Sequence, residues 1–235
     1  MSAVSEQLTQ IRQLMDRACE RAGRDPSSVR LVAVSKTFPA ADIMEAVSAG
    51  QFGFGESRLQ EAEPKIAELP VDLEWHFIGR VQRNKVRKIL QLFHCIHAVD
   101  SQKLAAYMNG IAGELGLRPK VFLQVDQAGE ETKGGITPAE LFAAMPALAG
   151  LSHIRICGLM SIPPAVGNPE DARHWFRELR ELRDDLSRKF FMELPWLSMG
   201  MSGDFEIAVE EGATHVRIGS LIFGKREYKL EGELG

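Results

Sequence analysis

Short apolar runs alternate along this chain with stretches in which hydrophobic residues recur every three or four positions. The clearest run, Leu31-Val-Ala-Val34, has four consecutive apolar residues, which is typical of a strand buried on both faces in a parallel sheet. Runs of similar character predict further strands at 52–55, 73–78, 95–99, 120–125, 154–159, 194–198 and 215–218.

The segments between these runs have the spacing of amphipathic helices. The first helix is predicted before any strand, because Leu8, Ile11, Met15 and Ala18 share one helical face and Gly23 ends the pattern. Further helices are predicted at 39–49, 58–69, 83–92, 101–115, 137–148, 168–186 and 204–211.

This alternation predicts an α/β fold made of parallel βαβ units. Eight strand–helix repeats favour a closed (β/α)8 TIM barrel over an open doubly wound sheet, and an extra N-terminal helix precedes them. A barrel of this kind typically needs about 250 residues, so we expect residues 1–235 to form one domain.

Composition and charge narrow the range of partners. The chain is 45% hydrophobic and 26% charged, with a net charge of −4, so no overall charge favours nucleic acid or an anionic membrane. Three cysteines form no disulfide framework and suit a reducing compartment. The N-terminus is polar, and no apolar run approaches the ~18 residues of a membrane span. We therefore expect a cytoplasmic protein.

Lys36 is the first candidate for chemistry, because ligands of such barrels bind at the C-terminal ends of the strands. Lys36 follows the first predicted strand with only Ser35 between them. A free lysine, with a pKa of roughly 10.4, is a poor nucleophile at neutral pH, but desolvation or a nearby cation lowers that value. An aldehyde could then condense with the amine. Taken alone, Lys36 could equally be a solvated lysine at a strand end.

Two turns at the same end of the predicted barrel have the composition of an anion site. Met199-Gly-Met-Ser-Gly203 leads into a helix, so Met199, Gly200 and Ser202 are candidates to surround a phosphate with N–H and hydroxyl groups. Gly219 and Ser220 follow the eighth strand, where barrels often bind phosphate. The alternative is a helix cap and a tight turn. A lysine facing such a cup would suit a phosphorylated aldehyde.

At this point the chain resembles the pyridoxal phosphate homeostasis proteins, which are related to the barrel domain of alanine racemase. The matching segments run through most of the sequence and are specific only in combination. They are Val34-Ser-Lys-Thr37, Phe54-Gly-Glu56, Trp75-His-Phe-Ile-Gly79 with Gln82 and Asn84-Lys85, Gly158-Leu-Met160, Leu197-Ser-Met-Gly-Met-Ser202 with Asp204, and Val216-Arg-Ile-Gly219 with Ile222-Phe-Gly224.

The resemblance implies a cofactor and the residues that hold it. Lys36 would carry pyridoxal 5′-phosphate as a Schiff base, with Ser202, Gly219 and Ser220 around the phosphate and Arg217 facing the pyridine nitrogen. A charged guanidinium disfavours protonation of that nitrogen, which makes the ring a weaker electron sink. Without the resemblance, Arg217 could be a structural ion-pair residue. The family usually has Asn after Gly-Glu, where this chain has Ser57, so a cofactor contact from Ser57 is in doubt.

The resemblance favours a carrier that buffers the cofactor in vitamin B6 homeostasis and passes it to pyridoxal-phosphate-dependent apo-enzymes, as a monomer without turnover of its own. The alternative is an amino-acid racemase, which needs an acid/base group on each face of its substrate. Alanine racemases supply one, a tyrosine, from an extra β domain. The sequence offers only Tyr107, within a predicted helix, and Tyr228 in a polar tail, and it stops at Gly235. We therefore expect no second base.

Two further readings are disfavoured. A metal at His94 and His97 is not expected, because the two side chains should point to opposite faces of one strand. A nucleic-acid or protein-binding role for the basic cluster is also disfavoured, because no aromatic residues are interleaved for base stacking. That cluster consists of Arg80, Arg83, Lys85, Arg87 and Lys88.

Overall fold

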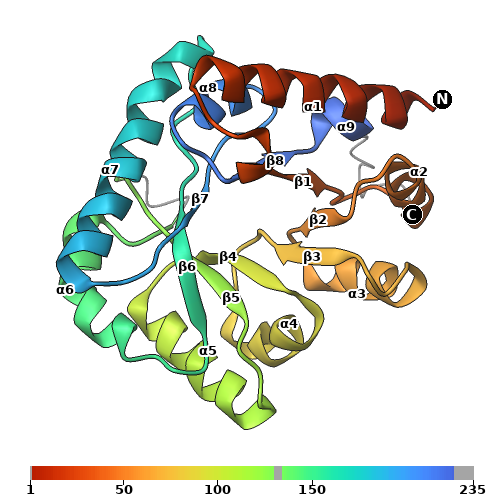
Figure 1. The fold of residues 1–235 in the computed structure, drawn as a ribbon. Coiled ribbons are helices and arrows are strands. Elements are labelled where there is room, and N and C mark those ends of the chain that lie inside the picture. Colours follow the sequence, from red (N-terminus) through yellow and green to blue (C-terminus); the bar gives the residue numbers. More distant parts are fainter. Residues whose placement is uncertain (1, 130–133, 225–235) are drawn as a thin grey trace, which may run out of the picture.

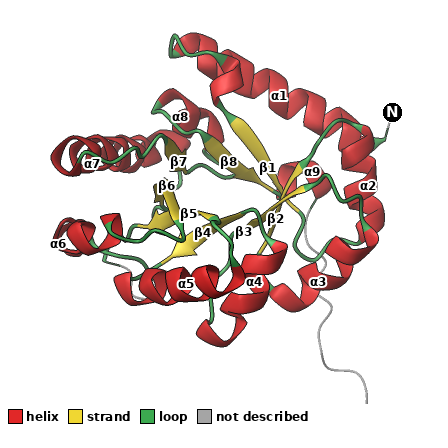
Figure 2. Cartoon of the chain, turned by 60° about the horizontal axis from the view of Figure 1, so that its bottom comes forward, coloured by secondary structure: helices red, strands yellow, loops and turns green. Residues whose placement is uncertain are grey.

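The parallel strands lie at the centre of the molecule and the helices surround them (Figure 1, Figure 2). The structure, a computed structural model, describes residues 2–129 and 134–224. Within these residues, eight parallel strands close into a barrel in chain order, and the eighth pairs with the first. The strands are β1 (Arg30–Val34), β2 (Gly53–Glu56), β3 (Glu74–Phe77), β4 (Cys95–Val99), β5 (Lys120–Gln124), β6 (Arg155–Met160), β7 (Trp196–Ser198) and β8 (His215–Ile218). The predicted barrel is confirmed.

Each strand is followed by an α-helix, and the helices after β7 and β8 are the shortest of those described. The α-helices are α1 (Ala3–Arg21), α2 (Ala40–Ser48), α3 (Leu59–Glu68), α4 (Val86–Leu92), α5 (Gln102–Leu115), α6 (Pro138–Ala149), α7 (Arg173–Phe190), α8 (Phe205–Glu210) and α9 (Ser220–Phe223). Short 3-10 turns are η1 (Pro26–Ser28), η2 (Arg83–Lys85) and η3 (Pro169–Ala172). The capping box at Thr137 and Glu140 starts α6 as expected. Within the described parts of the chain, no helix is long and apolar enough to cross a membrane.

The extra helix α1 covers one side of the barrel, next to α2, α8 and α9 (Figure 1). Its predicted face is buried, since Leu8, Ile11, Met15 and Ala18 are at most 6% exposed. These residues join the core between the helices and the outer face of the sheet. The helix therefore completes the helical layer over β1, which leads to Lys36, and β8, which contains Arg217.

Candidate cofactor site

Lys36 lies at the C-terminal mouth of the barrel, in the turn that follows β1. It is half-buried and comes two residues after the strand ends at Val34. The register of β1 with β8 places Ala33 opposite Ile218, so the segments after both strands leave the barrel side by side. Lys36 and the predicted turn at Gly219 thus share one mouth, as the sequence predicts.

The turn that carries Lys36 is anchored by a buried ion pair. The Lys65 ammonium on α3 donates to Glu56 Oε1 at 2.8 Å and to the Ser35 carbonyl oxygen at 2.9 Å. The Ser35 hydroxyl donates to the same carboxylate oxygen at 2.8 Å. Burial raises the pKa of Glu56, while the Lys65 charge acts in the opposite direction. The residue before Lys36 is therefore fixed through both its side chain and its backbone.

Backbone strain lies directly beside Lys36. Thr37 has a φ of 73°, in the left-handed region that a β-branched residue rarely adopts. Its N–H donates to Glu61 Oε2 at 3.3 Å. Further along the same loop, the Phe38 ring lies 5.1 Å, centroid to centroid, from the Phe223 ring of α9. The lysine turn and the segment after β8 are thus packed together.

The turn after β8 passes so close to Val34 at the end of β1 that residue 219 is best accommodated as glycine. A Cβ added there would lie 3.1 Å from the Val34 carbonyl oxygen and 3.2 Å from its Cβ. Gly219 is buried, whereas Ser220, the first residue of α9, is exposed. The bare backbone next to an exposed hydroxyl is an arrangement in which a phosphate can approach N–H groups.

The turn after β7 is built on a second required glycine. Gly200 has a φ of 90°, and a Cβ there would lie 2.5 Å from Ala208 Cβ. The Met201 N–H donates to Asp204 Oδ1 at 2.7 Å, which closes the turn. The Met199 side chain is fully buried in the core, and its N–H already donates to the His215 carbonyl oxygen at 3.1 Å, so a phosphate contact from Met199 stays a prediction that these contacts do not favour.

Ser202 faces a surface hollow of about 560 Å³ beside α8. The charged groups around this hollow are Arg21, Glu170, Asp204, Glu206 and Glu210. Because carboxylates outnumber the single guanidinium, this side of the turn would repel a phosphate. A phosphate bound by Ser202 must therefore lie on the barrel side of the turn.

Arg217 lies inside the barrel below the mouth and is 5% exposed. Its Nη1 donates to Ser198 Oγ at 2.6 Å, and its Nη2 donates to the Ser161 carbonyl oxygen at 3.0 Å. Burial lowers the pKa of Arg217 to about 10, which still leaves the guanidinium charged at neutral pH. The side chain is thus a fixed cation held by the ends of β6 and β7.

Ser57, the residue that departs from the family pattern, follows β2 and is half-buried. A Cβ at Gly79 would lie only 2.1 Å from the Ser57 carbonyl oxygen, so the segments after β2 and β3 touch through their backbones. The observed contact at this position therefore belongs to the Ser57 backbone, and a contact from its hydroxyl to the cofactor stays a prediction.

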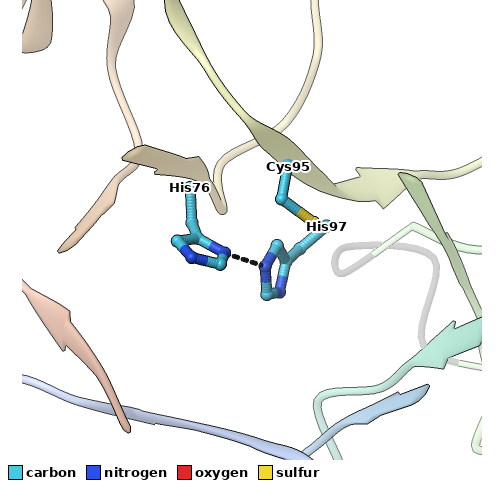
Figure 3. Close-up of side chains that lie close together, drawn as sticks. All are labelled: His76, Cys95 and His97. Carbon is cyan, nitrogen blue, oxygen red and sulfur yellow. Dashed lines mark hydrogen bonds between the residues drawn. The ribbon is translucent and has the colours of Figure 1, made fainter. Parts of the chain in front are cut away.

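Two histidines extend the hydrogen bonds of Arg217 across the barrel, and Figure 3 shows the bond that joins His76 and His97. His97 Nδ1 lies 2.7 Å from Ser198 Oγ, and His97 Nε2 lies 2.9 Å from His76 Nδ1. Since β4 is not a neighbour of β7 in the closed sheet, the bond from His97 to Ser198 crosses the interior. Sequence reasoning missed this network. The available signal was strand alternation in β4, which puts His97 on the same face as Cys95.

The interior histidines are held neutral. Burial, with smaller contributions from nearby cations, lowers the pKa of His76 to about 4. Burial also holds the pKa of His97 and of His215 well below the ordinary value. Each ring therefore carries one proton at neutral pH and can act as a donor at one nitrogen and an acceptor at the other.

His76, Cys95 and His97 each offer one nitrogen or sulfur atom that could bind a metal, and these atoms all lie within 4.8 Å of one another. Figure 3 shows the three side chains. The nitrogens of the two histidines that face each other are already joined by a hydrogen bond. His94 takes no part, because its Nδ1 accepts from the Trp75 N–H at 3.1 Å and its side chain is exposed. As expected, His94 and His97 point to different sides of the sheet.

The basic cluster after β3 is largely engaged in structural contacts. Arg87 pairs with Glu114, and Lys88 pairs with Glu63. The Arg83 guanidinium lies 4.7 Å from the centroid of the Tyr107 ring on α5. Three of the five basic side chains therefore make contacts within the layer of helices.

Comparisons with known proteins identify the family of the chain. Residues 7–227 match the family described as "Alanine racemase, N-terminal domain". The chain is 46% identical over 224 residues to the pyridoxal phosphate homeostasis protein of Aquifex aeolicus, covering 95% of this chain and 98% of the relative. It is 44% identical over 230 residues to the protein of the same name from Pseudomonas aeruginosa, covering 97% and 98% of the two chains.

Solved structures show the same fold. PipY of Synechococcus elongatus, determined with and without pyridoxal phosphate, has a TM-score of 0.85 and 43% identity, covering 94% of this chain and all of PipY. An alanine racemase of Clostridium difficile has a TM-score of 0.71 at 14% identity and shows the fold alone, with 60% of its chain covered. The chain belongs to the alanine racemase N-terminal domain family and, within it, to the pyridoxal phosphate homeostasis proteins.

Proposed function

We propose that this chain binds pyridoxal 5′-phosphate covalently through Lys36 and acts as a carrier in vitamin B6 homeostasis. The observation that carries the proposal is the placement of Lys36 and Gly219 after neighbouring strands at one mouth of the barrel. The names of the relatives and the pyridoxal-phosphate-bound structure of PipY support it.

The residues present fit the cofactor. The bare backbone at Gly219, with Ser220 and Ser202 beside it, offers N–H and hydroxyl donors for the phosphate. Lys36 offers the amine, and Arg217 offers a fixed positive charge inside the barrel for the pyridine end. When bound, the cofactor supplies an aldehyde and an electron-withdrawing ring. A permanent cation at the pyridine nitrogen keeps that nitrogen unprotonated, which weakens electron withdrawal.

The same contacts favour a carrier over a racemase. Arg217 is anchored by Ser198 and Ser161, so its charge cannot swing away from the ring. Among the described residues, the tyrosine Tyr107 lies on α5 against Arg83, in the outer layer of helices. Tyr228 lies outside the described residues. We infer that the chain delivers its cofactor to apo-enzymes in the cytoplasm and does so as a monomer.

Cofactor binding is tested by mixing the protein with pyridoxal phosphate, removing free ligand by gel filtration, and recording the absorption spectrum. We expect the wild-type protein to keep a visible band and Lys36→Ala to lose it. Lys103→Ala is the matched control, because Lys103 is exposed on α5. An unchanged band in Lys36→Ala would reject the covalent assignment. The elution volume also reports whether the protein is a monomer.

The carrier role is tested separately from binding. The loaded protein is incubated with a pyridoxal-phosphate-dependent apo-enzyme, and the recovered enzyme activity is measured. In parallel, it is incubated with single enantiomers of amino acids. We expect activity to be restored and the enantiomers to persist. Sustained racemisation at enzyme-like rates would overturn the carrier role.

A further inference from the structure

A continuous row of hydrogen bonds runs through the interior of the barrel, from the proposed cofactor site towards the opposite mouth. Its links are Arg217 to Ser198 at 2.6 Å, Ser198 to His97 at 2.7 Å, and His97 to His76 at 2.9 Å. We call these four residues the interior chain. All of them are at most 5% exposed.

The far end of the interior chain reaches the N-terminal end of the barrel. His76 Nε2 lies 3.7 Å from Glu74 Oε1, somewhat farther than a hydrogen bond. Both residues line a hollow of about 430 Å³ together with residues that precede or begin β1 and β2, among them Arg30 and Gly53. The interior chain thus spans the barrel from one mouth to the other.

The proton positions along the interior chain follow from its two ends. A guanidinium can only donate, so Ser198 Oγ accepts from Arg217. The Ser198 hydroxyl then donates its own proton to His97 Nδ1. Nδ1 must therefore be unprotonated, and the His97 proton is on Nε2. His97 Nε2–H donates to His76 Nδ1, which leaves the His76 proton on Nε2, facing the acceptor-only Glu74 carboxylate.

The opposite direction is disfavoured on the same grounds. If His97 carried its proton on Nδ1, Ser198 would accept two hydrogen bonds. Its own buried proton would then find no acceptor among the contacts of the described residues. Leaving one buried donor unmatched costs about 1–3 kcal/mol. Both histidines should therefore be Nε2–H tautomers.

We propose that Ser198 and His97 are positioning residues that hold Arg217 against the pyridine end of the cofactor, and that His76 influences the same contact from the opposite end of the barrel. This inference rests on the proposed function for the identity of the ligand. An arginine side chain has many rotamers, and a hydroxyl oriented by a neutral imidazole restricts the guanidinium to one plane without adding a second buried charge.

The first test needs no cofactor. Protein labelled with ¹⁵N-histidine is studied by long-range ¹H–¹⁵N NMR, and the signals are assigned with His97→Gln and His76→Gln. We expect His97 and His76 to show the pattern of Nε2–H tautomers at neutral pH. A proton on Nδ1 of His97 would overturn the direction of the interior chain, whatever the protein binds.

The second test measures the pyridine end of the cofactor. Protein loaded with ¹⁵N-pyridine-labelled pyridoxal phosphate is compared for wild type, Ser198→Ala and His97→Phe. We expect both variants to change the ¹⁵N shift and to weaken cofactor binding roughly three- to tenfold, since each removes one link. His76→Phe should change the shift in the same sense by a smaller amount. A wild-type shift in all three would overturn the inference.

Conservative variants and a neighbouring residue separate positioning from packing. Ser198→Thr keeps the hydroxyl and His97→Gln keeps one donor and one acceptor, so both should recover towards wild type. Cys95→Ala perturbs the same buried core next to His97 without removing a link, and its shift should be unchanged. Equal effects in Cys95→Ala and Ser198→Ala, or one zinc ion per chain that is lost in Cys95→Ala, would overturn the inference.

Failures of the two proposals can be told apart. If the wild-type protein retains no cofactor on Lys36, the proposed function fails, while the tautomer measurement remains a valid test of the interior chain. If Lys36 is labelled but the Ser198 and His97 variants behave as Cys95→Ala does, only the positioning role fails. Near-UV circular dichroism verifies that each variant folds. If His97→Phe does not fold, the comparison of Ser198→Ala with Ser198→Thr decides whether the positioning role holds.

Discussion

Lys65 and Glu56 form the buried ion pair that supports the lysine turn. The Lys65 side chain is 12% exposed and the Glu56 side chain is fully buried. Removing the ammonium leaves the carboxylate buried without its cation. We therefore predict that Lys65→Met lowers the free energy of unfolding by about 3 kcal/mol. Denaturant unfolding at neutral pH measures this.

The matched control for that variant is Lys88→Met. Lys88 pairs with Glu63 on the surface, where the two side chains are 58% and 45% exposed. An exposed pair of this kind contributes less than about 1 kcal/mol. Equal decreases in the free energy of unfolding for Lys65→Met and Lys88→Met would contradict a larger contribution from the buried pair.

From the interior histidines we predict that the free energy of unfolding decreases in acid. Burial lowers the pKa of His76 to about 4 and of His97 and His215 well below 6.5, so the unfolded chain binds more protons as the pH falls. Their contribution is present above pH 6.5 and is lost as the pH drops towards the folded values, by at most about 1.4 kcal/mol per pH unit for each ring.

The measurement is the difference in unfolding free energy between about pH 7 and about pH 5. We expect His97→Gln to show a smaller difference than wild type, and His153→Gln, at an exposed position, to match wild type. The titratable groups and cations that act on His76 are Glu74, His94, Arg30 and Lys120, and those that act on His97 are His76, His215 and Arg217. Equal pH dependence in the two variants would contradict neutral interior histidines.

At the level of single residues, the sequence predicted positions at strand ends better than contacts across the barrel. Lys36 and Gly219 lie at one mouth because parallel strands all end there, and Arg217 lies in β8 below them. The bond between His97 and Ser198 joins strands that are far apart in the sheet. Strand periodicity tells which face a residue occupies but not which distant strand it meets, so this contact needed coordinates.

At the level of elements, the turn between β7 and α8 depends on Gly200. Its φ of 90° is unfavourable for other residues, and a Cβ there would overlap the Ala208 Cβ on α8 at 2.5 Å. We predict that Gly200→Ala lowers the free energy of unfolding by about 2–4 kcal/mol, from backbone strain and overpacking together.

Gly203 in the same turn supplies the control. A Cβ at Gly203 meets nothing within 4 Å, and its φ is outside the left-handed region. Gly203→Ala should therefore change stability by less than about 0.5 kcal/mol. Thermal and denaturant unfolding of the two variants decide the point, and a tolerated Gly200→Ala would show that the turn is not held as the structure describes.

Most elements followed the sequence pattern, including the short strand β8, and two differences lie in short helical segments. The predicted helix at 168–186 begins with the 3-10 turn η3, and α7 starts only at Arg173. The four-residue α9 was not predicted as a helix, because Ser220–Phe223 is too short to show a helical period. Its place is fixed by tertiary contact, with Phe223 against Phe38.

At the scale of the whole molecule, the closed barrel brings segments distant in sequence to one mouth. The eightfold alternation was sufficient to predict this closure, and the comparisons with PipY agree with it. The interior is unusually polar for its depth, with Arg217, Ser198 and three histidines among its fully or nearly buried residues. We propose that this polar interior positions Arg217 and so affects the pyridine end of the cofactor.

The central claim is that Lys36 holds the cofactor, and chemical trapping tests it most directly. Purified protein loaded with pyridoxal phosphate is reduced with borohydride, digested and mapped by mass spectrometry. The account predicts that the peptide containing Lys36 gains the mass of the reduced cofactor in near-stoichiometric yield, with other lysines unlabelled. Stable label on a different lysine, or no label on a protein that still retains the cofactor, would contradict it.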